Sequence, residues 1–115
     1  MYVHTGIYER LKQVAKAQGL ISYGEVAPVA NLDMASPADR TTISALLDWI
    51  NQDEEKHGRP MISAPVVRVG EQTPGPGFFV CARNLGRLAS RDEVDEVGFW
   101  AMEVKKVHTF WNNQA

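Results

Sequence analysis

The sequence predicts a mostly helical α+β fold, because it holds two helix-start motifs and one segment with the composition of a strand. Ser22 and Glu25 match a capping box, in which each side chain bonds the backbone amide of the other residue. Residues 36–39 (Ser-Pro-Ala-Asp) repeat the signal, with Pro37 at the first helical position, where its missing N–H is not needed. The segment 65–69 is rich in valine, which favours a strand.

Two helices are expected in the first third of the chain. Apolar residues recur at helical spacing over residues 5–18, which predicts an amphipathic helix that ends at Gly19. A second helix is expected over residues 23–30, where Pro28 would kink or shorten it. The apolar positions of the first helix are Ile7, Leu11, Val14 and Ala15.

A long third helix is predicted over residues 37–57, after a connection at residues 31–35. Gly58 and Pro60 follow it in the order expected beyond a helix end. A short helix, a tight connection and a long capped helix give a helix-turn-helix-like, and with a β element a winged-helix-like, outline over about residues 1–86. The stripe of the long helix that we expect to face the core consists of Ile43, Leu46, Leu47 and Ile50.

The segment after the predicted strand 65–69 admits two interpretations. Residues 70–77 are rich in Pro and Gly and are expected to form a loop. The aromatic start of residues 78–85 suits a returning hairpin strand, which would complete a true wing. The spacing of Phe78, Cys81 and Leu85 also suits a short helix, which is the interpretation we favour.

The final helix is predicted over about residues 90–112. Ser90 and Asp92 can cap it, and acids near its start and lysines toward its end match the helix dipole. Its expected buried stripe consists of Val97, Trp100, Ala101, Val104, Val107, His108 and Trp111. Three further apolar residues lie off this stripe, so the helix is either packed on two sides or forms a homodimer seam; they are Phe99, Met102 and Phe110.

Length and composition indicate one soluble domain over residues 1–115. Hydrophobic residues make up 44% and charged residues 23% of the chain, which is ordinary for a globular protein. No apolar run approaches the ~18 residues that a membrane span needs, so no membrane partner is expected. The single cysteine, Cys81, favours a reducing, cytoplasmic setting. The net charge of −2 gives no general attraction to nucleic acid, so any basic surface must be local.

No motif indicates catalysis, a cofactor or a metal ion. The Pro-Gly run at residues 74–77 lacks the lysine and hydroxyl of a phosphate-binding loop. The three histidines are far apart and have no further ligand at metal-binding spacing. The apolar neighbours of Cys81 favour an inert thiol. We therefore expect no catalytic residue, no cofactor and no metal, and an enzyme built around Ser63 and Cys81 would lack an identifiable base.

A few residues could contact double-stranded DNA. In a helix-turn-helix the second helix presents polar side chains to the major groove, and only the first turns of the helix over residues 37–57 carry suitable ones. Arginines elsewhere could hold backbone phosphates. The candidate nucleic-acid-binding residues are Tyr23, Arg40, Thr41, Ser44, Arg68, Arg83 and Arg87.

Two resemblances follow from the residues. The run at 58–67 (Gly-Arg-Pro-Met-Ile-Ser-Ala-Pro-Val-Val), followed by Pro-Gly-Pro-Gly-Phe-Phe at 74–79, resembles a set of small uncharacterised bacterial and phage proteins. These share an Arg-Pro-apolar-apolar-Ser-Ala block and a Pro-Gly-x-Gly-Phe block. The resemblance covers about residues 20–86 and implies no activity.

The second resemblance is to the winged-helix domain of alkylguanine-DNA alkyltransferases and alkyltransferase-like proteins. It rests on the run at 21–27 (Ile-Ser-Tyr-Gly-Glu-Val-Ala), on Arg40 and on the extended Val-Val-Arg-Val segment. In that family a Tyr-Gly-x-x-Ala helix precedes a recognition helix whose arginine enters the base stack, and Tyr23 and Arg40 match these positions. Residues 63–66 (Ser-Ala-Pro-Val) replace the Pro-Cys-His-Arg block, so the resemblance implies a DNA-facing scaffold without alkyl transfer.

The resulting hypothesis is a non-catalytic DNA-binding or DNA-associated module. The alternative is a protein-interaction or assembly module that dimerises through the C-terminal helix and binds no nucleic acid. The alternative rests on the surplus apolar side chains of that helix and on the acidic half of the helix over residues 37–57.

Overall fold

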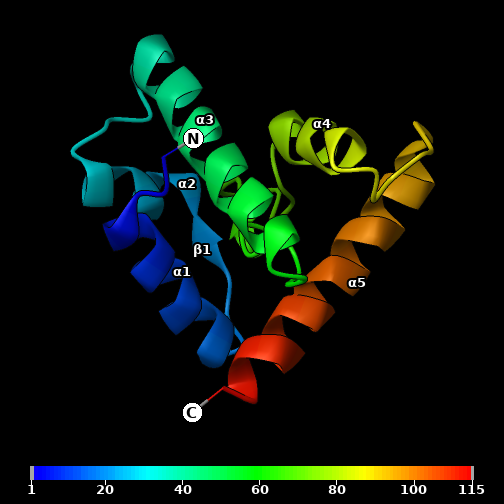
Figure 1. The fold of residues 1–115 in the computed structure, drawn as a ribbon. Coiled ribbons are helices and arrows are strands. Elements are labelled where there is room, and N and C mark those ends of the chain that lie inside the picture. Colours follow the sequence, from blue (N-terminus) through cyan, green and yellow to red (C-terminus); the bar gives the residue numbers. More distant parts are fainter. Residues whose placement is uncertain (1, 115) are drawn as a thin grey trace.

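The computed structural model describes residues 2–114 and shows a mostly helical α+β arrangement (Figure 1). Helix α3 runs through the middle of the molecule, with α1 and α2 on one side and α4 and α5 on the other. The far end of α5 returns to contact α1. In chain order the elements are α1 (Thr5–Lys16), β1 (Ile21–Ser22), α2 (Tyr23–Val26), the 3₁₀ helix η1 (Ala27–Ala30), α3 (Pro37–Lys56), β2 (Val66–Val67), α4 (Pro76–Asn84) and α5 (Glu93–Asn112).

The capping residues that the sequence predicts stand at three of the helix starts. The Ser22 hydroxyl accepts the Glu25 amide at 3.2 Å, and the Glu25 carboxylate accepts the Ser22 amide at 3.3 Å. Ser36 Oγ accepts the Asp39 amide at 3.3 Å at the start of α3. The Asp92 carboxylate accepts two amides at the start of α5. Each cap provides a partner for an amide that the first helical turn leaves without one.

The sheet is smaller than the sequence analysis expected. The predicted strand at residues 65–69 is reduced to β2, which pairs in parallel with β1, Ile21 beside Val66 and Ser22 beside Val67. Residues 76–84 form α4, which confirms the helical interpretation of the ambiguous segment and excludes a returning hairpin strand there. The helix expected over residues 23–30 ends at Val26 and continues as η1, because Pro28 has no amide proton to extend α-helical bonding.

The core lies between α3 and the elements on both of its sides. The apolar stripe predicted for α3 is buried, and it meets the buried segment that leads from α3 into β2. The largest buried apolar side chains of the core are Ile7, Leu11, Ile43, Ile50, Met61, Ile62, Val26, Val66 and Val107. No helix within residues 2–114 is long and apolar enough to cross a membrane.

Helix α5 buries most of the stripe predicted for it (Trp100, Val104, Val107, His108 and Trp111 are buried or half-buried), but it differs from the prediction at two positions. Val97 and Ala101 of the expected stripe are exposed, whereas Glu103 is 1% exposed. The reason is that the Glu103 carboxylate is held by Arg87 Nη1 at 3.0 Å and by the Met61 amide at 3.0 Å. A carboxylate with such partners can occupy a buried position that periodicity assigns to an apolar residue. Two of the three residues placed off the stripe, Phe99 and Phe110, pack against the core of their own chain, while Met102 is 56% exposed.

Candidate functional site

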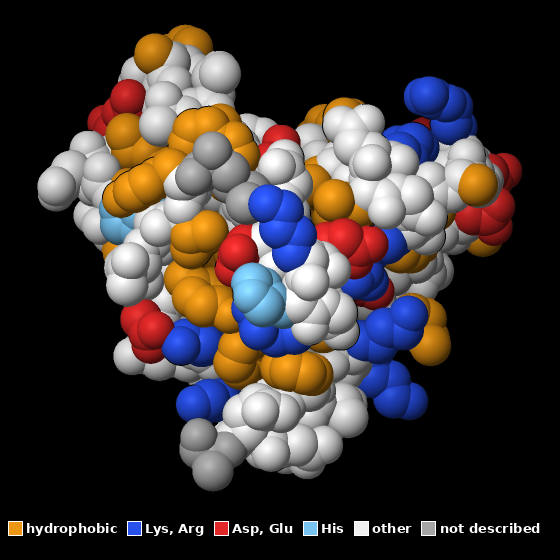
Figure 2. Space-filling model, viewed as in Figure 1, with side chains coloured by type: hydrophobic (Ala, Val, Ile, Leu, Met, Phe, Trp, Pro, Cys, Tyr) orange, Lys and Arg blue, Asp and Glu red, His pale blue; other side chains and the backbone are white. Residues whose placement is uncertain are grey.

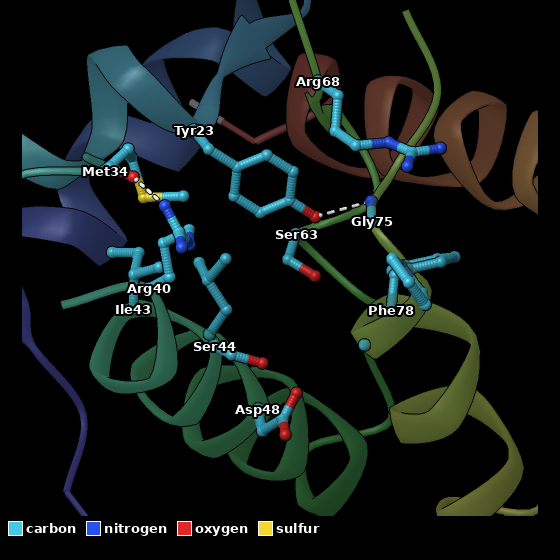
Figure 3. A pocket seen from close by; sticks show the side chains of 13 residues that line it. Tyr23, Met34, Arg40, Ile43, Ser44, Asp48, Ser63, Arg68, Gly75 and Phe78 are labelled. Carbon is cyan, nitrogen blue, oxygen red and sulfur yellow. Dashed lines mark hydrogen bonds between the residues drawn. The ribbon is translucent and has the colours of Figure 1, made fainter. Parts of the chain in front are cut away.

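A cavity of about 210 Å³ opens where α2, the first half of α3 and the start of α4 meet (Figure 3). Its wall is mostly apolar, and its polar groups come from segments far apart in the sequence. This combination of an apolar wall with a few converging polar groups is typical of a binding site. The lining residues are Tyr23, Met34, Arg40, Ile43, Ser44, Leu47, Asp48, Ser63, Arg68, Gly75, Pro76, Gly77 and Phe78.

Tyr23 and two glycines hold the wall of the cavity together. The Tyr23 hydroxyl accepts the Gly75 amide at 2.9 Å, which joins α2 to the residue that precedes α4 (Figure 3). A Cβ at Gly75 would lie 3.3 Å from the Tyr23 hydroxyl, and a Cβ at Gly77 would lie 3.0 Å from Ser44 Oγ. The Pro-Gly run at residues 74–77 thus lets the start of α4 approach α2 and α3 closely. Burial raises the pKa of Tyr23, so the phenol stays neutral.

Asp48 is the carboxylate of the cavity. It lies one helical turn beyond Ser44 on α3 and is partly buried, and no cationic side chain among residues 2–114 forms an ion pair with it. Burial raises the pKa of Asp48, an effect that a hydrogen bond with the Cys81 thiol partly offsets. The Asp48 carboxylate therefore binds a proton more tightly than a carboxylate in water does.

Behind the cavity lies a small buried polar group built on Asn51. Asn51 Nδ2 donates to Ser63 Oγ at 2.7 Å, and Asn51 Oδ1 accepts the Ser63 amide at 3.3 Å. The same Nδ2 lies 3.9 Å from Cys81 Sγ. Burial, and next the charge of Asp48, raise the pKa of Cys81 to about 12. The thiolate, which is the nucleophilic form, is therefore scarce at neutral pH, in agreement with the inert role that its sequence neighbours predicted.

Two arginines stand on either side of the cavity mouth (Figure 3). Arg40, in the first turn of α3, donates from Nη1 to the Met34 carbonyl at 2.8 Å. Arg68 follows β2 and pairs with Glu71 at 2.5 Å on the surface. Thr41 lies beside Arg40, and it lines a shallow surface hollow together with Arg40, Ser44 and Asp48. Five of the predicted nucleic-acid-binding residues thus gather at one place, which we call the cavity rim: Tyr23, Arg40, Thr41, Ser44 and Arg68.

The other two candidates, Arg83 and Arg87, lie elsewhere. Arg83 forms an ion pair with Glu96 and donates to the Ser90 carbonyl. Arg87 pairs with Glu55 at 2.6 Å and with Glu103 at 3.0 Å. Both guanidinium groups fasten α5 to the rest of the protein, and neither lines the cavity.

Sequence reasoning missed Asp48, Ser63 and Phe78 as members of the site. Asp48 lies beyond the first turns of the helix, in the part that the sequence does not favour for DNA contact. The spacing of Arg40, Ser44 and Asp48 at intervals of four residues carried a usable signal, because such residues lie along one line of a helix. Nothing in the sequence brings Ser63 or Phe78 to that line, since only the folded connection after α3 and the start of α4 place them there.

Comparison of the chain with protein-family models, with curated proteins and with solved structures finds no match. The two resemblances described above therefore stay predictions. Within residues 2–114 no group of three or more His, Cys, Asp and Glu side chains lies close enough to hold a metal ion. A functional conclusion rests on the cavity and its rim, which combine free positive charge, hydroxyl groups and an apolar interior.

Proposed function

We propose that the protein is a non-catalytic module of helix-turn-helix-like outline, with α4 in place of a hairpin wing, that binds double-stranded DNA through the cavity rim. The observation that carries the proposal is the gathering of Tyr23, Arg40, Thr41, Ser44 and Arg68 around the cavity and the shallow hollow that shares Arg40 and Ser44 with it. They come from α2, from α3 and from the residue that follows β2, so it is the fold that brings them together. A cytoplasmic location, which the single cysteine favours, is part of the proposal.

Arg40 is the principal phosphate-binding candidate. It is exposed, and no carboxylate among the described residues lies within ion-pair distance of its guanidinium group. Its one hydrogen-bond acceptor, the Met34 carbonyl, is neutral. The first turn of α3 also carries the positive end of the helix dipole. A free guanidinium at a helix start is a favourable partner for a phosphate oxygen.

Arg68 supplies a second positive charge across the cavity mouth. Its ion pair with Glu71 joins two exposed side chains, and such surface pairs contribute about 0–1 kcal/mol. A phosphate could therefore replace Glu71 at little cost. The hydroxyls of Thr41 and Ser44, which line the hollow beside Arg40, offer further hydrogen bonds to phosphate or base edges.

The proposal assigns binding and no change of covalent bonds. The Cys81 thiol is protonated at neutral pH, and two histidines are engaged away from the cavity. His4 Nδ1 accepts the Ile7 amide at the start of α1, and His108 Nε2 lies 2.9 Å from the Gly19 carbonyl. Asn51, the side chain that hydrogen-bonds Ser63, is not a base. Asp48, the carboxylate of the described cavity lining, hydrogen-bonds with the Cys81 thiol, but the raised pKa of that thiol leaves little thiolate to act as a nucleophile.

The test is fluorescence anisotropy with a labelled mixed-sequence duplex at about 50 mM and about 200 mM salt. Wild-type protein should bind at low salt and weaken steeply at the higher salt. Arg40→Ala and Arg68→Ala should each reduce affinity and flatten the salt dependence by about one phosphate contact. Arg10→Ala, which removes an exposed arginine of α1 outside the rim, is the matched control and should bind as wild type. The absence of binding at micromolar protein and low salt, or unchanged binding by Arg40→Ala, would overturn the proposal.

A further inference from the structure

One side of α5 is exposed and apolar. Val94 is 78% exposed, Val97 is 52% exposed and Met102 is 56% exposed, and the small residues Gly98 and Ala101 lie between them. A Cβ built at Gly98 would meet no atom within 4 Å, so this part of the helix is open to an approaching surface. A helix that buries one side in its own core normally shows polar residues on the other. The exposed side of α5 departs from that pattern.

Opposite charges stand at the two ends of this exposed side. The acids Glu93 and Asp95 lie in the first turn of α5, whereas Lys105 and Lys106 lie three turns further on, and all four are exposed. Figure 2 shows acidic side chains gathered over the first turns of α5, with lysine or arginine next to hydrophobic side chains further along it. At 1.5 Å per residue the acidic and basic groups are separated by roughly 16 Å along the axis. The valines, Gly98 and Ala101 occupy the stretch between them.

A groove runs beside the two lysines. It has a volume of about 530 Å³ and lies between the segment that ends α3 and the second half of α5. Pro60, Met102 and Phe110 supply its apolar surface, and Lys105 and Lys106 stand at its edge. The two arginines that line it, and Lys106, are paired with carboxylates of this chain, so among the described lining residues Lys105 carries the available positive charge. The groove suits a segment that is both apolar and acidic.

We propose that two copies of this chain associate through α5, packed antiparallel about a two-fold axis near Gly98 and Ala101. In this arrangement the acidic, valine-bearing first turns of each helix lie against Met102, Lys105 and Lys106 of the other copy. The interface is self-complementary, as a two-fold dimer requires. A parallel arrangement would place acids beside acids and lysines beside lysines, which is unfavourable. The association uses no residue of the cavity rim and is independent of the proposed DNA contact.

The charges favour a second copy of this chain as the partner, because α5 carries both the acidic groups and the lysines that would meet them. The predicted dimer seam of Phe99, Met102 and Phe110 is thereby revised. Phe99 faces the core of its own chain, and Met102 belongs to the new surface. The small residues at the crossing point allow the two helix backbones to approach closely, which increases the contact between the flanking side chains.

Sedimentation equilibrium on the full chain, from micromolar to submillimolar concentration, tests the proposal. Wild-type protein should reach the mass of a dimer. The double variants Lys105→Glu/Lys106→Glu and Glu93→Lys/Asp95→Lys should each be monomers over the same range, with circular dichroism spectra like that of wild type. An equimolar mixture of the two should associate again as a heterodimer, since the opposite charges are restored between chains.

The matched control is Lys16→Glu/Lys56→Glu, which reverses two exposed lysines at the ends of α1 and α3 and should dimerise as wild type does. A wild-type protein that is monomeric at submillimolar concentration would overturn the proposal. So would charge-reversed variants that associate as strongly as wild type, or a mixture of the two that stays monomeric. Gly98→Trp offers a second check, because a bulky side chain at the crossing point should prevent association without touching any charge.

Discussion

Helix α3 carries carboxylates in two contrasting settings. Near its end, Glu54 is fully buried and faces Arg59 and Tyr8, and Glu103 of α5 is buried beside Arg87. Two turns earlier, Asp48 is only partly buried, yet no cationic side chain among residues 2–114 pairs with it. The buried acids have partners and the acid of the cavity lacks a counter-charge. The paired acids stabilise the fold, whereas the carboxylate of Asp48 is available to a ligand.

The buried carboxylates of Glu54 and Glu103 accept hydrogen bonds from side chains and from a backbone amide. Glu54 Oε1 accepts the Tyr8 hydroxyl at 2.8 Å and Arg59 Nε at 2.9 Å. Burial and the hydrogen bond to Glu54 raise the pKa of Tyr8 well above its usual value, so it serves as a donor throughout the physiological range. Specific donors replace water at one oxygen of each carboxylate, which lowers the cost of burying the charge, whereas Glu54 Oε2 is buried without a hydrogen-bond partner.

Removing a partner from the paired cluster should have the largest effect. Arg87→Met retains the apolar stem but takes the guanidinium from Glu103, which is 1% exposed. Leaving a buried charge without its partner typically destabilises a protein by about 3–5 kcal/mol. Urea denaturation should show a loss of free energy of unfolding in that range. The exposed Arg91→Met is the control and should be nearly neutral. A loss below about 1 kcal/mol would mean that the cluster is not what fastens α5.

Removing a hydrogen bond from the cavity wall should have an intermediate effect. Tyr23→Phe leaves the Gly75 amide without its acceptor but retains the ring. A hydrogen bond between neutral groups contributes about 0.5–1.5 kcal/mol, so the free energy of unfolding should fall by that amount. Tyr2→Phe, at a tyrosine that is 55% exposed, is the matched control in the same denaturation experiment. If both variants behave alike, the link between α2 and α4 contributes nothing measurable.

Neutralising the acid of the cavity should have a small effect of the opposite sign. Burial raises the folded-state pKa of Asp48, so the folded protein binds the proton more tightly than the unfolded chain does. The charged form therefore destabilises the fold above the folded-state pKa, and this destabilisation disappears as the pH falls below the ordinary value of 3.8. Asp48→Asn should raise the melting temperature slightly at pH 7, with the gain lost near pH 3. A variant that melts lower than wild type at pH 7 would contradict the conclusion that the charge of Asp48 destabilises the fold.

The helix starts could be predicted from the sequence because their signals are local. Ser22, Ser36 and Asp92 each act on amides two or three residues away, so the residues that identify the cap are adjacent in the chain. The same holds for the end of α2, where Pro28 alone stops the α-helix. These features position the cavity, since they determine where α2 and α3 begin.

The buried acids could not be predicted, because what permits their burial is distant in the chain. Glu103 becomes a core residue only through Arg87 and the Met61 amide, and this displaces Val97 and Ala101 to the surface. Apolar periodicity treats every acid as a solvent-facing residue, so it leaves Glu103 out of the core and places Val97 and Ala101 in it. The same limit applies to the site. Arg40 and Ser44 share one helix, so they could be grouped from the sequence. Ser63 and Phe78 join them only in the folded chain.

The parallel pairing of β1 with β2 has a consequence for the order of folding. Each strand has two residues, and the chain between Ile21 and Val66 includes the whole of α3. So short a pair provides too few hydrogen bonds to offset the entropy of closing so long a loop. The helices can begin to form from local contacts, within microseconds, but this pair must wait until α3 has packed between its two neighbouring layers. We therefore expect the small sheet to form late in folding. The hydrogen bond from the Ile21 amide to the Pro65 carbonyl, at 3.0 Å, should be among the last to form.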